Sequence, residues 1–211
     1  MDCDYRFWWN WWVNLAVAVG TLLTVFVALF GETLRAKWFG PALKLKLLRD
    51  EGEKAPLVGL NQGVEESLGD SRYYHLHVWN ERRWSPAEGA QVYLISIAEP
   101  GPSGDFQIVW LGDVPMRWRH QETLPFLRTI GAAADCDLCR VEKAGKIFLF
   151  MPLIVPTNLP VTKRGAFTLV ASLQVRSNQA DSQVLRIRIS WDGLWEDGDR
   201  EMRRHLEIKP V

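Results

Sequence analysis

The sequence predicts an all-β, antiparallel β-sandwich of about eight strands, preceded by one transmembrane α-helix. Three observations lead to this prediction. An uncharged apolar stretch runs from Phe7 to Phe30, the rest of the chain alternates apolar and polar residues in short runs, and Gly-, Pro- and Ser-rich turns separate those runs. Period-two alternation is typical of strands with one buried face. We therefore place a helical anchor at residues 1–40 and a β-domain at residues 41–211.

The apolar stretch is long enough to cross a bilayer. At about 1.5 Å per residue it spans roughly 36 Å, against a hydrocarbon core of about 30 Å. Four tryptophans cluster within Trp8–Trp12 at one end of the stretch, and Trp38 and Phe39 follow the other end. Membrane helices carry similar aromatic belts at both interfaces. A cleaved signal peptide has a shorter apolar region, and cleavage at the Ala-x-Ala site Ala16–Ala18 would leave an apolar stump. We expect a retained signal anchor rather than a cleaved signal or a buried core helix.

The basic residues around this stretch predict its orientation. Arg6 alone precedes it, whereas five basic residues follow it closely: Arg35, Lys37, Lys44, Lys46 and Arg49. Lys and Arg flanking a span remain on the cytoplasmic side. We expect the N-terminus outside and the β-domain in the cytoplasm, at the inner membrane if the source is bacterial. The low, odd cysteine count fits a reducing compartment better than a disulfide-linked secreted module.

Every polar side chain of the stretch falls on one seam with the a/d spacing of packed helices. The seam consists of Asn10, Asn14, Val17, Thr21, Thr24, Ala28 and Gly31. Asn side chains hydrogen-bond across helices in membranes, and small residues allow close approach. We expect association with a second copy or with another membrane protein. The alternatives are a lone anchor with Asn10 in interfacial water, and a pore lined by Asn and Thr.

After the stretch, the helix continues through Glu32–Phe39 and ends at Gly40–Pro41, which suits a helix C-terminus. Eight runs then read as strands because apolar residues alternate or cluster between turn residues. They are Leu43–Leu48, Tyr73–Asn80, Ala90–Ile97, Phe106–Leu111, Lys146–Leu153, Gly165–Arg176, Gln183–Trp191 and His205–Pro210. The lysines of the first run face solvent or lipid headgroups.

Two long segments lack this pattern. Arg49–Arg72 is polar and Gly-rich, and it reads as a loop with one weak strand at Leu57–Leu60. Gly112–Cys139 reads as irregular, with a short helical turn near Gln121–Leu127. The acidic run at Asp192–Glu201 reads as a solvated loop, since it lacks the pattern of a calcium-binding loop.

One segment carries a family resemblance. In LHVWNERRWSPAEGAQVYL a strand ends in Asn, and a turn bearing Pro and Ala leads into a second alternating strand. The residues involved are Val78, Asn80, Pro86, Ala87, Val92 and Leu94. This segment resembles paired strands of immunoglobulin-like adhesion and CARDB-type β-sandwich modules, although the Cys…Trp…Cys pattern of true immunoglobulin domains is absent. The resemblance implies a scaffold and no particular activity.

Composition and motifs argue against several functions. Lys plus Arg equals Asp plus Glu at 25 each, so the chain lacks the basic excess of a nucleic-acid binder. Nucleophile-elbow, zincin and P-loop motifs are absent. We expect no nucleic-acid partner, no cofactor, no metal and no catalytic residues. The alternative is a metal- or thiol-dependent enzyme centred on Cys136 and Cys139, with histidines completing a zinc site.

Three tryptophans lie in charged segments rather than in apolar runs: Trp84, Trp118 and Trp195. Arg beside Trp is typical of interaction hot spots. We predict a protein-binding surface formed by Arg82, Arg83, Trp84, Arg117, Trp118, Arg119 and His120. The sequence thus predicts a single-pass, membrane-anchored, non-enzymatic interaction protein in a homo- or hetero-oligomeric complex. The alternatives are the enzyme described above and a pore-forming membrane effector.

Overall fold

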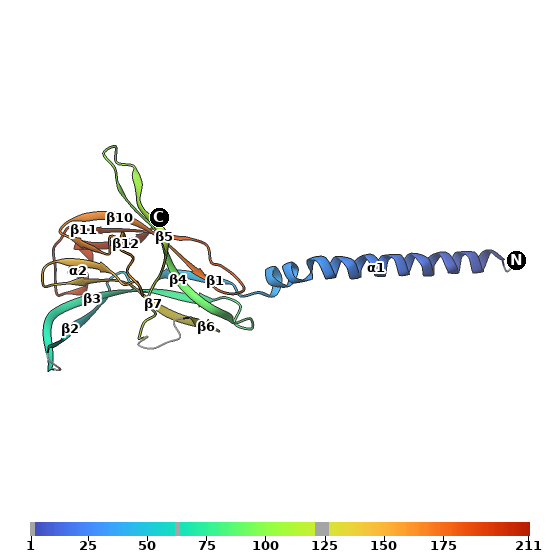
Figure 1. Cartoon of the computed structure of the whole chain (residues 1–211), viewed down its shortest axis with the longest axis horizontal. Coiled ribbons are helices and arrows are strands. Elements are labelled where there is room, and N and C mark those ends of the chain that lie inside the picture. The colour runs from blue at the N-terminus through green and yellow to red at the C-terminus, as the bar shows by residue number, and fades with distance from the viewer. Residues whose placement is uncertain (1–2, 62–63, 121–126) are drawn as a thin grey trace. The chain divides into compact units, whose positions relative to one another are not determined.

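The computed structural model describes residues 3–61, 64–120 and 127–211, which fall into two compact units, Met1–Gly40 and Pro41–Val211. The first unit contains the helix α1 (Cys3–Phe39; Figure 1). Within α1, Trp8–Gly31 is long and apolar enough to cross a membrane, and none of this stretch is buried in the protein. An N-terminal helix of transmembrane length is therefore confirmed.

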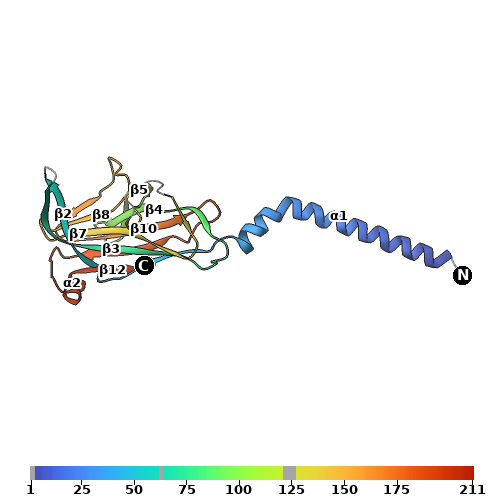
Figure 2. The ribbon, with the colours of Figure 1, turned by 90° about the horizontal axis from the view of Figure 1, so that it is seen from below.

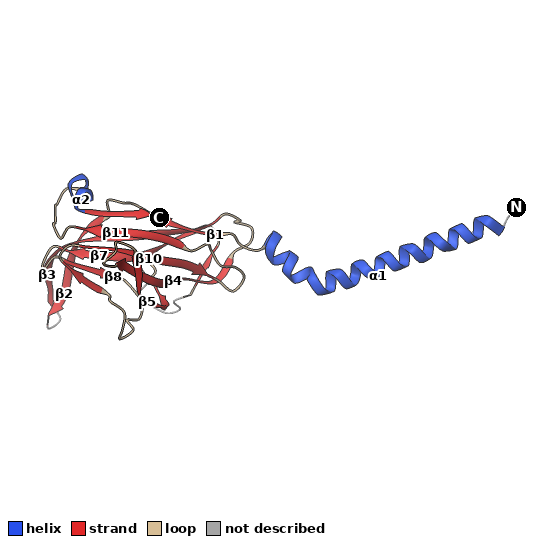
Figure 3. Cartoon of the chain, turned by 90° about the horizontal axis from the view of Figure 1, so that it is seen from above, coloured by secondary structure: helices blue, strands red, loops and turns tan. Residues whose placement is uncertain are grey.

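The second unit is mostly antiparallel β-structure, as predicted, but its described residues form twelve strands instead of about eight. The strands are β1 (Leu43–Leu47), β2 (Glu53–Asn61), β3 (Val64–Asn80), β4 (Ala87–Pro100), β5 (Phe106–Pro115), β6 (Arg128–Ile130), β7 (Ala133–Glu142), β8 (Ile147–Phe150), β9 (Thr162–Arg164), β10 (Phe167–Arg176), β11 (Leu185–Trp191) and β12 (Leu206–Pro210). A short helix, α2 (Asp199–His205), precedes β12 (Figure 3).

The strands form two antiparallel sheets. The β3 sheet has the order β1-β3-β7-β8-β9, with β2 paired to β3, and the β4 sheet has the order β12-β11-β10-β4-β5, with β6 paired to β4. Figure 2 shows β3 and β7, which are hydrogen-bonded neighbours, running side by side through the domain. Both sheets contribute to one hydrophobic core, in which Leu76 of β3 and Leu94 and Leu169 of the β4 sheet are fully buried.

The alternating pattern identified the core face of several strands. Leu169, Ala171, Leu173 and Val175 of β10 are buried, as their period-two spacing predicts. β5 departs from the pattern: Trp110 is buried, but Ile108 is 63% exposed. The register between β4 and β5 shifts twice, once between Ile97 and Ala98, where β5 carries an extra residue. Such a bulge breaks the alternation of faces along the strand.

Two segments expected to be irregular are largely strands. Arg49–Arg72 contains β2 and the first half of β3, which pair from Glu53 with Tyr73 to Asn61 with Val64. Gly112–Cys139 contains the end of β5, all of β6 and most of β7. The acidic run is also not wholly a loop, because α2 begins at Asp199. The helical turn expected at Gln121–Leu127 lies almost entirely outside the described residues.

Candidate binding site on the outer face of the β3 sheet

The side chains of β3 divide between two faces. Tyr74, Leu76 and Val78 are buried in the core, so Tyr73, His75, His77 and Trp79 lie on the opposite, outer face. Neighbours in this outer row stack. The ring centroids of Tyr73 and His75 are 6.4 Å apart at an interplanar angle of 4°, and those of His77 and Trp79 are 5.9 Å apart at 22°. The row is thus an ordered aromatic strip on the sheet surface.

Each histidine of the strip is held by an aspartate of β7. The antiparallel register places His75 opposite Asp137 and His77 opposite Asp135. The Nδ1–H groups donate to the Asp Oδ1 atoms, at 2.9 Å for His75 and 2.8 Å for His77. Because the carboxylate fixes the proton on Nδ1, Nε2 of each imidazole is directed away from β7 and is available to other partners.

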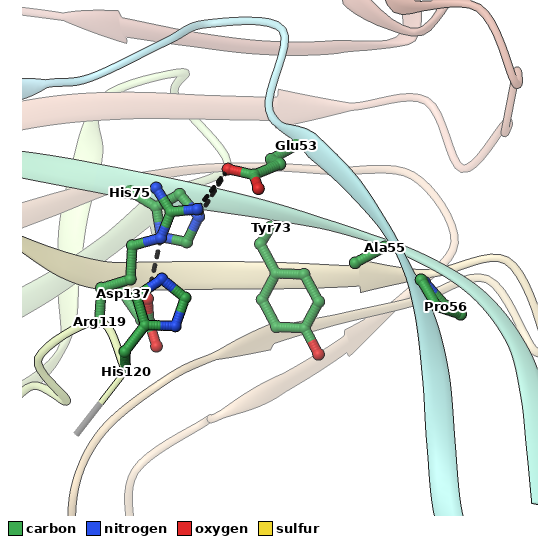
Figure 4. Close-up of a pocket in the computed structure, with 8 residues that line it drawn as sticks. All are labelled: Glu53, Ala55, Pro56, Tyr73, His75, Arg119, His120 and Asp137. Carbon is green, nitrogen blue, oxygen red and sulfur yellow. Dashed lines mark hydrogen bonds and ion pairs between the residues drawn. The ribbon is translucent and has the colours of Figure 1, made fainter. Parts of the chain in front are cut away.

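A pocket of about 280 Å³ opens beside His75 (Figure 4). Its lining is Glu53, Ala55, Pro56, Tyr73, His75, Arg119, His120 and Asp137. A second cavity of about 420 Å³ shares four of these residues: Glu53, Tyr73, His75 and Arg119. The two cavities therefore form one depression on the outer face, centred on the pair of strands β2 and β3.

The polar groups of the pocket lie close to one another. Arg119 Nη2 lies 2.6 Å from Glu53 Oε2, and the same oxygen lies 3.8 Å from His75 Nε2. His75 then donates to Asp137. In Figure 4 these groups gather on one side, with Tyr73, Ala55 and Pro56 forming the other. The pocket thus offers fixed donors and acceptors next to an apolar wall, an arrangement that binds a side chain of mixed polarity.

The pocket lining contains no Ser, Thr or Cys among the described residues. The Tyr73 hydroxyl accepts a long 3.5 Å hydrogen bond from Arg140 Nη1, and the Arg140 guanidinium lies over the Tyr73 ring. The histidines and carboxylates of the pocket do not form a group of three placed to hold a metal ion, in the part of the chain that the structure describes.

The structure separates the residues predicted to form one interaction surface. Arg119 and His120 line the pocket, and Arg117 is exposed beside them. The prediction is wrong for Trp118, which is 1% exposed and lies in the core. Its indole N–H donates to Gln91 Oε1 of β4 at 3.1 Å, and the Arg128 guanidinium lies over its ring. In this extended segment successive side chains point to opposite sides, so Arg117 and Arg119 point outward while the Trp118 ring points inward.

Arg82, Arg83 and Trp84 lie in the turn between β3 and β4, away from the pocket. Asn80, where this turn begins, lies five residues after His75 along β3, which corresponds to about 17 Å. Arg83 and Trp84 are exposed, Trp84 by 73%. Trp195, the third tryptophan in a charged segment, is half-buried over the Arg72 guanidinium.

Cys136 and Cys139 lie in β7 and not in a loop. Both are free and buried in the core, and burial raises the pKa of each thiol well above its usual range. They share the core face because a bulge opposite Tyr74–His75 inserts one residue between them. His75 and His77 lie on the outer face of the neighbouring strand. This geometry removes the basis for a zinc or thiolate site built from these cysteines and histidines.

The predicted helix seam lies along α1. Its members from Asn10 to Ala28 are exposed, and Gly31 is half-buried. The Thr21 hydroxyl donates to Val17 O at 2.8 Å, and the Thr24 hydroxyl donates to Gly20 O at 2.9 Å. Both hydroxyls are therefore satisfied within their own helix. The groups of the seam that remain for hydrogen bonds with another helix are the amides of Asn10 and Asn14.

Sequence reasoning missed Glu53, Tyr73 and Asp137 as members of the site. A signal for part of it exists, because His75-x-His77 and Asp135-x-Asp137 are two period-two pairs of opposite chemistry. Two such pairs lie on single faces of two strands, and they meet if the strands are neighbours.

A scan against protein-family models finds no match for the chain, and a search of curated proteins finds no significant relative.

Proposed function

We propose that this protein is a single-pass, membrane-anchored interaction module. In this proposal α1 spans the membrane with its N-terminus outside, and the cytoplasmic domain is an immunoglobulin-like β-sandwich that binds a partner protein. The observation that carries the proposal is the pocket on the outer face, where Arg119 and His120 lie beside the paired groups Glu53, His75 and Asp137. The sandwich is supported by the single core that both sheets share.

The pocket suits a protein side chain for physical reasons. A His–Asp pair and an Arg–Glu pair are already formed in the free protein, so little ordering is needed when a partner binds. Aromatic and Arg residues dominate hot spots at protein interfaces. Tyr73 and Arg119 supply both types within one depression. We propose that the complex is a homo- or hetero-oligomer in the plane of the membrane, held also by the amides of Asn10 and Asn14.

A photo-cross-linking experiment in native membranes tests this proposal. A benzophenone amino acid is introduced at His120, at the rim of the pocket, and in a second variant at Lys209, an exposed residue of β12. Irradiation is expected to give a discrete adduct, identified by mass spectrometry, from position 120 and not from position 209. No adduct at position 120, or the same adducts at both positions, would contradict the proposed site.

A matched pair of arginine variants sharpens the result. Arg119→Ala removes the guanidinium from the pocket, whereas Arg176→Ala removes an arginine that forms an ion pair with Asp113 at 2.9 Å outside it. Loss of an interfacial arginine at a hot spot costs about 2 kcal/mol or more, which corresponds to a roughly 30-fold weaker complex. Arg119→Ala is expected to abolish the adduct at position 120, and Arg176→Ala is expected to retain it.

A further inference from the structure

We propose that the turn Glu81–Ser85 binds the anionic headgroups of the bilayer that α1 crosses, through Arg83 and Trp84. This inference rests on the membrane anchoring in the proposed function, but it is independent of the pocket. It replaces the sequence-based expectation that these residues form one protein-binding surface with Arg119 and His120. The turn then sets the orientation in which the domain presents its pocket beside the membrane.

A buried asparagine ties the turn to the point where the chain enters the domain. Asn80 is 1% exposed, and its Oδ1 accepts hydrogen bonds from the backbone N–H groups of Ala42 and Arg82, both at 3.0 Å. Its Nδ2 donates to Ser85 O at 2.7 Å, and Glu81 N donates to Ala42 O at 2.9 Å. The turn therefore lies at the same end of the domain as Ala42, three residues after the last residue of α1.

The aromatic residues of α1 indicate the depth at which the domain begins. Trp8 and Trp12 precede Trp38 by 30 and 26 residues, or about 45 and 39 Å of helix. A bilayer with its headgroup layers is about 40–45 Å thick. If Trp8–Trp12 lie at one interface, then Trp38 and Phe39, which are exposed, lie at headgroup level on the other. Ala42 and the turn bonded to it follow directly after this level.

The chemistry of the turn suits a headgroup layer. Trp84 presents most of its indole to the surroundings, and indoles concentrate at membrane interfaces because the ring is amphipathic. Arg83 is exposed beside it, and Lys44 lies opposite Trp79 on the adjacent strand β1. Glu81 is exposed and offsets part of this positive charge. Basic residues near an anionic surface are attracted over a Debye length of about 8 Å.

Depth measurement on the full chain in lipid nanodiscs tests the proposal. A spin label is placed at Ser85→Cys in a Cys3→Ser background, so that Arg83 and Trp84 remain and the two buried thiols stay unlabelled. Its relative accessibility to oxygen and to a water-soluble nickel chelate reports depth. A control label is placed at Ser103→Cys, in the exposed turn between β4 and β5. Incorporation into the discs shows separately that α1 anchors the protein.

In discs that contain anionic phospholipid, the label at position 85 is expected at headgroup depth and the label at position 103 in water. Adding Arg83→Glu and Trp84→Ser is expected to move the label at position 85 into water, as is replacing the anionic lipid with a neutral one. Aqueous accessibility at position 85 in anionic discs would overturn the proposal. Headgroup depth that survives both substitutions would also overturn it, because the turn would then be placed by the tether alone. Neither result affects the cross-link at His120.

Discussion

His75 and Asp137 face each other across strands β3 and β7, and the imidazole Nδ1–H donates to the carboxylate at 2.9 Å. Both side chains are largely buried, although they lie on the outer face of the sheet. The neighbouring pair, His77 and Asp135, has the same geometry at 2.8 Å, but more than a quarter of each side chain is exposed. The two pairs form a matched comparison within one strip.

Asp137→Asn is expected to destabilise the domain more than Asp135→Asn. A hydrogen bond to a buried charged group contributes about 1.5–3 kcal/mol, whereas an exposed pair contributes at most about 1 kcal/mol. For a domain of this size, about 1 kcal/mol shifts Tm by roughly 2–4 °C. Thermal unfolding should therefore show a fall in Tm of about 3–12 °C for Asp137→Asn and a smaller fall for Asp135→Asn. Equal decreases in Tm for the two variants would contradict the larger stabilisation expected from the more deeply buried pair.

Asp197 links the chain before α2 to the β3 sheet and predicts a response to acid. Its carboxylate lies 2.9 Å from Lys54 Nζ and 3.0 Å from Lys143 Nζ, and it accepts the Trp195 indole N–H at 3.1 Å. The hydrogen bond from Lys54, followed by those from Trp195 and Lys143, holds the pKa of Asp197 well below its usual range. The folded state therefore favours the ionised carboxylate more than the unfolded chain does.

A lowered pKa contributes stability that is present above the unfolded pKa of about 3.9 and is lost as the pH falls toward the folded value. Asp197→Asn removes this contribution. Its Tm is expected to lie below that of the wild-type protein at pH 6, and the gap is expected to narrow below pH 4. Glu196→Gln, at an exposed neighbouring position, serves as the control and should show no such convergence. A gap that stays constant with pH would contradict the role of this carboxylate.

The two buried thiols predict a pattern of chemical modification. Thiolates react with alkylating reagents, and burial both excludes the reagent and raises the pKa of Cys136 and Cys139. We expect neither residue to be alkylated in the folded protein at pH 8 and both to be alkylated in denaturant, as measured by mass spectrometry of the peptides. Rapid alkylation of either one in the folded state would revive the thiol-enzyme alternative.

The helix seam predicts unequal effects of its polar residues. Thr21 already donates to a carbonyl of its own helix, whereas the amide of Asn14 is available to a second helix. An interhelical hydrogen bond in a membrane contributes about 0.6–2 kcal/mol. Asn14→Leu is therefore expected to weaken self-association roughly 3- to 30-fold in a membrane FRET assay, and Thr21→Val is expected to have little effect. The reverse order would exclude the predicted seam.

The sequence determines some parts of this fold locally and leaves others to tertiary context. Alternation alone identifies the buried residues of β10, because one face of this strand covers the core. These residues are Leu169, Ala171, Leu173 and Val175. The polar hairpin of β2 and β3 shows no such signal, since pairing there depends on backbone groups rather than apolar side chains. The sequence of this hairpin therefore reads as a loop.

The site was harder to predict because its members come together through strand pairing. Trp118 reads as a surface residue from its charged neighbours, but its indole is buried against Gln91, which lies 27 positions away. The two cysteines share a face only because of the bulge in β7, which spacing alone does not reveal. Alternation with the buried Tyr74 and Leu76 puts His75 on the outer face of β3, yet Glu53 and Asp137 reach it only through the register of β2 and β7 with β3.

The most direct test of the membrane-anchored account is protease accessibility in sealed membrane vesicles of known orientation. With the cytoplasmic face enclosed, residues 41–211 are expected to resist added protease until detergent opens the vesicles, and with that face exposed they are expected to be degraded at once. Degradation of the domain from the non-cytoplasmic side, or its release from the membrane without detergent, would contradict the account.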